Sequence, residues 1–129
     1  MTIAFIDTKR REDFSEFKEM FDFIESYMGY LPNAYLLMAE NEALINSFSD
    51  LTNAIFLSKN IDAGTKQLIA LASSLSSGCK YCQSHTAHGA ERSGISIKKI
   101  SDILNYSKSI LFDDKEKALL DLAFASGTA

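Results

Sequence analysis

The chain has 129 residues, 47% of them hydrophobic and 23% charged, which is the composition of a folded globular protein rather than of a disordered or fibrous one. This length suits one domain with its own core and is short for two domains. The formal net charge of -4 at pH 7 argues against nucleic acids and anionic membranes as partners, because both attract basic surfaces.

The first residues do not show the order of residues that we expect of an export signal. The basic residues Lys9, Arg10 and Arg11 follow a short apolar start instead of preceding a longer one, which is the reverse of a signal peptide. No stretch approaches the roughly 18 apolar residues that cross a bilayer. We therefore expect a cytoplasmic protein. In a reducing cytosol, its two cysteines, Cys79 and Cys82, are more often catalytic, redox-active or metal-binding than structural.

A single proline and long stretches of helical periodicity predict an all-α fold. The first helix is expected to begin at a capping box, Asp13 to Glu16, and to stop at Gly29. Asp62 and Ser96 are placed as N-caps of later helices. These signals predict helices near residues 14–28, 33–39, 41–57, 63–75, 79–93, 97–104 and 114–125.

The helix predicted at 63–75 is apolar on nearly every face around Leu68–Ala72, as expected for a helix in a protein interior or an oligomer contact. No linker is visible, so we expect one domain over residues 1–129. Residues 126–129 look like a turn toward something that does not follow, as in a truncated form. After Ser96, four apolar residues are expected to face inward: Ile97, Ile100, Ile103 and Leu104.

The segment from Gly78 to His88, Gly-Cys-Lys-Tyr-Cys-Gln-Ser-His-Thr-Ala-His, carries the candidate chemistry. Cysteines three residues apart on a helix have Cα atoms about 5 Å apart, within the range of a disulfide. The Ser-Ser-Gly before Cys79 places this cysteine at a helix N-terminus, where free N–H groups stabilise a thiolate. His85 lies one turn beyond Cys82, close enough to accept its proton. The pattern predicts a redox-active pair.

Other interpretations of these residues compete with the redox pair. Cys-x-x-Cys-x-x-His-x-x-His supplies four ligands of zinc type, but steps of three drift by about -60° around a helix, so Cys79 and His88 end on opposite faces. The two cysteines can also pack as small hydrophobes, and His88 can be a surface or interface histidine. We expect neither a metal nor another cofactor.

Three segments together resemble the carboxymuconolactone decarboxylase-like superfamily, and within it the alkyl hydroperoxidase D-like branch. They are the Cys-x-x-Cys segment, the apolar helix before it and the upstream Gly29–Asn33. The resemblance extends from about Met20 to Leu104. It implies an all-α fold with two long antiparallel helices near the redox pair, and assembly into homo-oligomers such as trimers or hexamers. It also implies thiol-dependent peroxidase activity, recycled by a disulfide-reducing partner protein.

The resemblance also implies roles for single residues. It implies that Cys82 attacks the peroxide and that Cys79 is the resolving cysteine. The family's relay glutamate, twelve residues before the first cysteine, corresponds to Gln67, which can hydrogen-bond but carries no titratable proton at pH 7. The histidine that best-known members carry four residues after the second cysteine corresponds to Thr86, and His85 precedes it by one residue. His85 is therefore expected to act as proton acceptor in an altered relay.

The leading hypothesis is a thiol peroxidase or disulfide oxidoreductase in antioxidant defence, which reduces hydroperoxides through Cys79 and Cys82. The first rival is a lyase or isomerase-like enzyme that acts on a small lactone or acid, with incidental cysteines. The second rival is a non-catalytic oligomeric helical module whose cysteine pair senses redox state or stabilises the fold.

Overall fold

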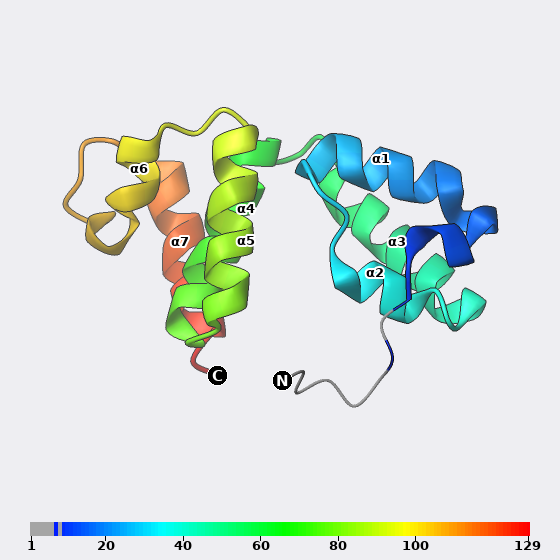
Figure 1. The fold of residues 1–129 in the computed structure, drawn as a ribbon. Helices are drawn as coiled ribbons and strands as arrows, with labels where there is room; N and C mark the ends of the chain where they lie inside the picture. The colour runs from blue at the N-terminus through cyan, green and yellow to red at the C-terminus, as the bar shows by residue number, and fades with distance from the viewer. Residues whose placement is uncertain (1–6, 8) are drawn as a thin grey trace. The chain divides into compact units, whose positions relative to one another are not determined.

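A computed structural model describes residue 7 and residues 9–129 of the chain (Figure 1). Every regular element in this part is an α-helix or a short 3-10 turn, which confirms the all-α prediction. The chain divides into two compact units, Met1–Leu57 and Ser58–Ala129. Among the described residues, no helix combines the length and the apolar character that crossing a membrane requires.

The elements follow the chain in a simple order. The first unit contains η1 (Arg11–Asp13), η2 (Ser15–Phe17), α1 (Lys18–Met28), α2 (Asn33–Met38) and α3 (Glu42–Phe56). The second unit contains α4 (Ala63–Ser76), α5 (Lys80–Arg92), α6 (Ile97–Ser101), η3 (Ile103–Asn105) and α7 (Asp114–Ser126).

The first unit is built around aromatic side chains of its N-terminal half. Phe21 and Ile45 are fully buried, and they join α1 to α3. The helix α1 ends at Gly29, which adopts a left-handed φ of 85° and donates its N–H to the Glu25 carbonyl. The remaining buried members of this core are Phe14, Phe17, Ile24, Tyr35 and Ala39.

The predicted capping box at Asp13 to Glu16 is wrong. The Asp13 carboxylate instead accepts the backbone N–H of Arg10 at 2.9 Å and so closes the preceding turn η1. A second 3-10 turn follows, and α1 begins only at Lys18. Phe14, between the two short turns, and Phe17, at the end of the second, are both buried in the core of this unit.

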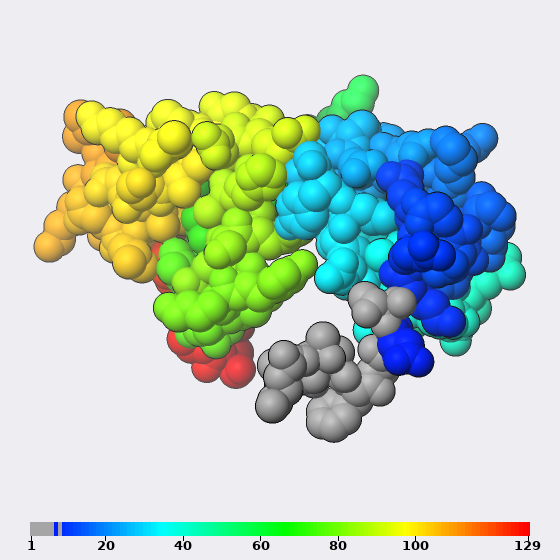
Figure 2. All heavy atoms as spheres, viewed as in Figure 1, coloured from blue at the N-terminus to red at the C-terminus, as the bar shows by residue number. Residues whose placement is uncertain are grey.

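The second unit has α4 at its centre, packed against α5 and α7 (Figure 1). Its core combines Leu68, Leu71 and Ala72 of α4 with Ala90 of α5 and Leu120 of α7. This burial explains why α4 is apolar on most faces. In the space-filling view, side chains of α5 and α6 cover one face of this unit (Figure 2).

The inward orientation predicted after Ser96 is only partly right. Ile103 is buried and Ile100 packs against the core, whereas Ile97 and Leu104 are 65% and 73% exposed. Leu104 lies in the 3-10 turn that follows the end of α6 at Ser101, so the 3.6-residue period does not extend to it, and Ile97 is the first residue of α6.

Candidate functional site

The turn between α4 and α5 fixes the start of the cysteine segment. Gly78 adopts a left-handed φ of 74° and its N–H reaches the Leu75 carbonyl at 3.3 Å. The Cys79 N–H reaches the Ser74 carbonyl at 3.1 Å. These two bonds form a Schellman motif, which satisfies the last carbonyls of α4 and stops the helix at a glycine. The first cysteine is thus held by the end of the preceding helix.

Cys79 is also the N-cap of α5. Its Sγ accepts the backbone N–H of Cys82 at 3.3 Å, the contact that a capping side chain makes with the first turn of a helix. The helix itself begins at Lys80, one residue later than predicted. N–H groups at a helix start favour a negative charge on a capping atom, and the Cys79 sulfur occupies that position.

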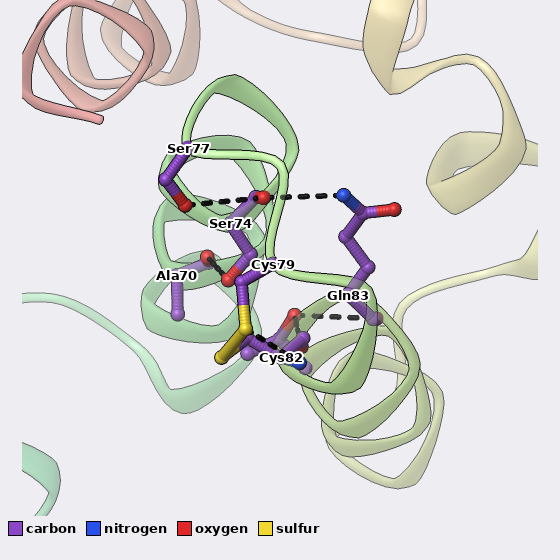
Figure 3. Close-up of a disulfide and its surroundings, with 7 residues drawn as sticks. Ala70, Ser74, Ser77, Cys79, Cys82 and Gln83 are labelled. Atoms are coloured by element: carbon purple, nitrogen blue, oxygen red, sulfur yellow. Dashed lines mark hydrogen bonds between the residues drawn. A yellow bond between two sulfur atoms is a disulfide. The ribbon is translucent and has the colours of Figure 1, made fainter. Parts of the chain in front are cut away.

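Cys79 and Cys82 are joined by a disulfide, with Cα atoms 5.3 Å apart (Figure 3). This separation lies within the usual range for disulfides and agrees with the distance expected from helical spacing. Both cysteines are half-buried. The backbone therefore brings the two sulfur atoms within bonding distance near the protein surface.

His85 lies on the side of α5 that carries Tyr81. The two rings stack nearly parallel, with centroids 6.0 Å apart and an interplanar angle of 10°. Burial lowers the pKa of His85 below its ordinary value of 6.5, and the neighbouring imidazole of His88 lowers it further. His85 is therefore held toward its neutral form, which can accept a proton. His88 is exposed one turn further along.

Gln67 lies on the buried face of α4, where it is 7% exposed. Its amide lies against Gly89 of α5, because a Cβ built on that glycine would be 2.7 Å from the Gln67 Cδ atom. Gly89 follows Cys82 by seven residues, or about 10 Å along a helix axis. The structure thus places Gln67 beside α5 but about two turns from the disulfide.

Thr86 occupies the position at which the resemblance implies a histidine. It is 8% exposed, and its Oγ1 donates to the Cys82 carbonyl at 2.7 Å. A side chain four residues after Cys82 is therefore buried, whereas His85, three residues after it, is half-buried and stacked on Tyr81. The change of offset moves the imidazole to another side of α5.

Sequence reasoning missed one contact of this site. The Nε2 of Gln83 donates to the Ser74 carbonyl at 3.2 Å and so connects α5 to the end of α4. The only signal available was an amide side chain directly after the second cysteine. Within the described residues, no three or more His, Cys, Asp or Glu side chains gather in a way that could hold a metal ion.

Comparisons with known proteins agree with this fold. The chain matches solved structures of the debrominase Bmp8, one without ligand and one of a cysteine-to-alanine variant in complex with 2,3,4-tribromopyrrole. Both share 31% sequence identity with this chain, with TM-scores of 0.87 and 0.88 respectively. The match covers 96% of this chain, which spans 67% and 66% of those two chains.

The family assignment comes from a different comparison. A search of curated proteins found no significant match. The family model described as the carboxymuconolactone decarboxylase family matches residues 42–125, which include α3, the whole cysteine segment and most of α7. The chain belongs to the carboxymuconolactone decarboxylase family.

Proposed function

We propose that the chain is a dithiol-dependent reductase that delivers two electrons to an electrophilic substrate as Cys79 and Cys82 close into a disulfide. The observation that carries this proposal is the bridged pair at the start of α5, with Cα atoms 5.3 Å apart and both residues half-buried. The N–H contact to the Cys79 sulfur and the lowered pKa of His85 support it. Family membership and the debrominase neighbours support an enzymatic role.

The first substrate class is a hydroperoxide, as the resemblance implies. Cys82, deprotonated with the help of His85, attacks the peroxide O–O bond, becomes a sulfenic acid and releases an alcohol once the leaving oxygen gains a proton. The Cys79 thiolate then attacks the sulfenic sulfur, forms the disulfide and releases water. One hydroperoxide and two thiols thus give one alcohol, one water and one disulfide. Gln67 occupies the position of the family's glutamate, but its amide lies against Gly89, about two turns from the disulfide, so it is given no proton-transfer role in these steps.

A dithiol protein is the proposed donor that reopens the bridge. Attack of the donor thiolate on the Cys82 sulfur expels Cys79 as a thiolate, and a stabilised thiolate leaves faster. The N–H of Cys82 at the Cys79 sulfur provides that stabilisation. A reducing cytosol supplies such donors, and assembly into a trimer or hexamer is part of the same proposal.

The second substrate class is a brominated pyrrole or a related aromatic halide. The similarity to a debrominase whose variant was solved with 2,3,4-tribromopyrrole favours it. The same dithiol suffices, because two thiols and one aryl bromide give one disulfide, one bromide, one proton and a ring carbon that carries hydrogen. Both substrate classes use the two electrons that the pair releases on bridging.

The test compares wild-type protein with Cys82→Ser, Cys79→Ser and the control Ser84→Ala, an exposed position of α5. Each protein receives tert-butyl hydroperoxide or 2,3,4-tribromopyrrole, with dithiothreitol as donor, and alcohol or bromide release is measured. We expect turnover of one substrate class, lost in Cys82→Ser and kept in the control. The two rival hypotheses predict other outcomes. If a lactone offered as a third substrate is turned over and both cysteine substitutions leave that turnover unchanged, the result supports a lyase. A melting temperature that depends on redox state, without turnover of any substrate, supports a redox sensor.

A further inference from the structure

The Ser74 carbonyl is a shared acceptor at the junction of α4 and α5. It accepts the Cys79 N–H at 3.1 Å and the Gln83 Nε2 at 3.2 Å, and the Ser77 hydroxyl lies 3.3 Å from it (Figure 3). The Ser74 residue is itself 8% exposed, and its own hydroxyl donates back to the Ala70 carbonyl. The acceptor therefore belongs to a firmly placed turn of α4.

Gln83 is connected to Cys79 by one direct hydrogen bond and by one shared acceptor. Its backbone N–H donates to the Cys79 carbonyl at 3.0 Å, as the first helical bond of α5, and its side chain shares the Ser74 carbonyl with the Cys79 N–H. The two routes close a ring of hydrogen bonds around the first cysteine. Cys82 precedes Gln83 directly in the chain, so the ring also fixes the backbone of the second cysteine.

We propose that Gln83 is a positioning residue that holds Cys79 and Cys82 at the spacing required for the disulfide. A glutamine amide suits this role because it donates at every pH and adds no charge beside a thiolate. Only the bridged state has a strict requirement for the spacing of the two sulfur atoms. Holding the turn therefore raises the effective concentration of one thiol at the other and favours the bridge over the dithiol.

The inference deepens the proposed function, on which it rests, because positioning has a use only if the pair cycles between dithiol and disulfide. A merely structural hydrogen bond has a different signature. It would stabilise the oxidised and reduced proteins equally, and its loss would leave the reduction potential unchanged. The reduction potential therefore separates positioning from general stabilisation.

The experiment equilibrates the full chain in glutathione redox buffers and measures the dithiol fraction by thiol alkylation. The variants are Gln83→Met, which keeps the size and removes the donor, and Gln83→Glu, which removes the donor and adds charge. Ser84→Ala is the control. We expect the equilibrium constant for disulfide formation to fall about threefold to tenfold in Gln83→Met, as for one lost hydrogen bond. That fall corresponds to a potential about 15–30 mV less negative. The fall should be smaller in Gln83→Glu, because its carboxylate also disfavours a thiolate in the reduced pair.

Melting temperatures of the oxidised and reduced forms complete the test and show that each variant is folded. Equal losses in both forms, with an unchanged potential, overturn the inference. A variant that does not fold leaves the decision to the other variant at the same position. If wild-type protein exchanges with glutathione but reduces neither substrate, the proposed function fails, while the potentials of the Gln83 variants still decide the positioning role.

Discussion

Gly89→Ala tests the contact between α4 and α5 most sharply. In an ordinary helix interior, alanine is more favourable than glycine by about 1 kcal/mol. Here a Cβ would lie 2.7 Å from both Cδ and Oε1 of Gln67, closer than such atoms approach in proteins. The amide of Gln67 is buried, so it must leave its rotamer at a cost of about 0.5–1.5 kcal/mol and weaken buried hydrogen bonding at a cost of about 1–3 kcal/mol.

After the gain of about 1 kcal/mol from alanine is subtracted, these terms predict that Gly89→Ala lowers the free energy of unfolding by about 0.5–3.5 kcal/mol. With Gln67→Ala already in place, the obstructing amide is gone, and the same change should raise the free energy of unfolding by about 1 kcal/mol. The coupling between the two positions is then about 1.5–4.5 kcal/mol, which a double-mutant cycle resolves. Urea denaturation of the four proteins in oxidised form provides the measurement.

The matched control for Gly89→Ala is the double mutant itself, because the backbone change at position 89 is identical in both backgrounds. A gain in stability in the wild-type background would refute the proposed contact between Gly89 and Gln67. An equal effect in both backgrounds would refute it as well. Activity assays on the same proteins then show whether displacing Gln67 affects turnover as well as packing.

Two further predictions concern charge. His88→Ala should raise the pKa of His85 toward 6.5. The rise should be incomplete, because burial is the larger cause of the lowered pKa and remains in the variant. Titration of the His85 imidazole by NMR measures this pKa, and an unchanged value contradicts the prediction. Because the folded protein binds the His85 proton less tightly than the unfolded chain does, the free energy of unfolding should fall as the pH drops from 6.5 toward the lowered pKa of His85. Asp62→Ala should cost about 1–2 kcal/mol at pH 7, because its carboxylate caps α4 through the N–H and hydroxyl of Thr65, whereas Asp62→Asn should cost less. The hydrogen bond from the Thr65 hydroxyl is the main cause of the lowered pKa of Asp62. The difference in free energy of unfolding between wild-type protein and Asp62→Ala should therefore shrink as the pH falls below 3.8. A difference that stays constant in urea denaturation between pH 7 and pH 3 contradicts this prediction.

The features that the sequence predicted well are local ones. Asp62 and Ser96 cap their helices through bonds to backbone N–H groups three residues away, and Gly29 ends α1 with a positive φ. Each of these signals acts within one turn of the chain, so no knowledge of the tertiary structure is needed. The wrong prediction at Asp13 also concerns a local signal. The backbone N–H groups of Arg10 and Glu16 are both close enough along the chain to bond to the Asp13 carboxylate, and the sequence pattern alone does not show which one does.

The candidate site divides in the same way. Helical spacing alone predicted that Cys79 and Cys82 could bridge, since their separation depends on one turn of helix. The bond from Gln83 to Ser74 could not be predicted, because it requires that the end of α4 and the start of α5 meet in an antiparallel pair. The stacking of His85 on Tyr81 depends on rotamers, which periodicity does not specify.

The central claim is that Cys79 and Cys82 become oxidised to a disulfide as substrate is reduced. A single-turnover experiment tests it most directly: fully reduced protein is mixed with limiting hydroperoxide or tribromopyrrole, and product and remaining thiols are counted together. We predict one disulfide between these two cysteines for each substrate molecule reduced. Product formation with both thiols still free would contradict the claim, as would complete inertness of the reduced pair toward both substrates.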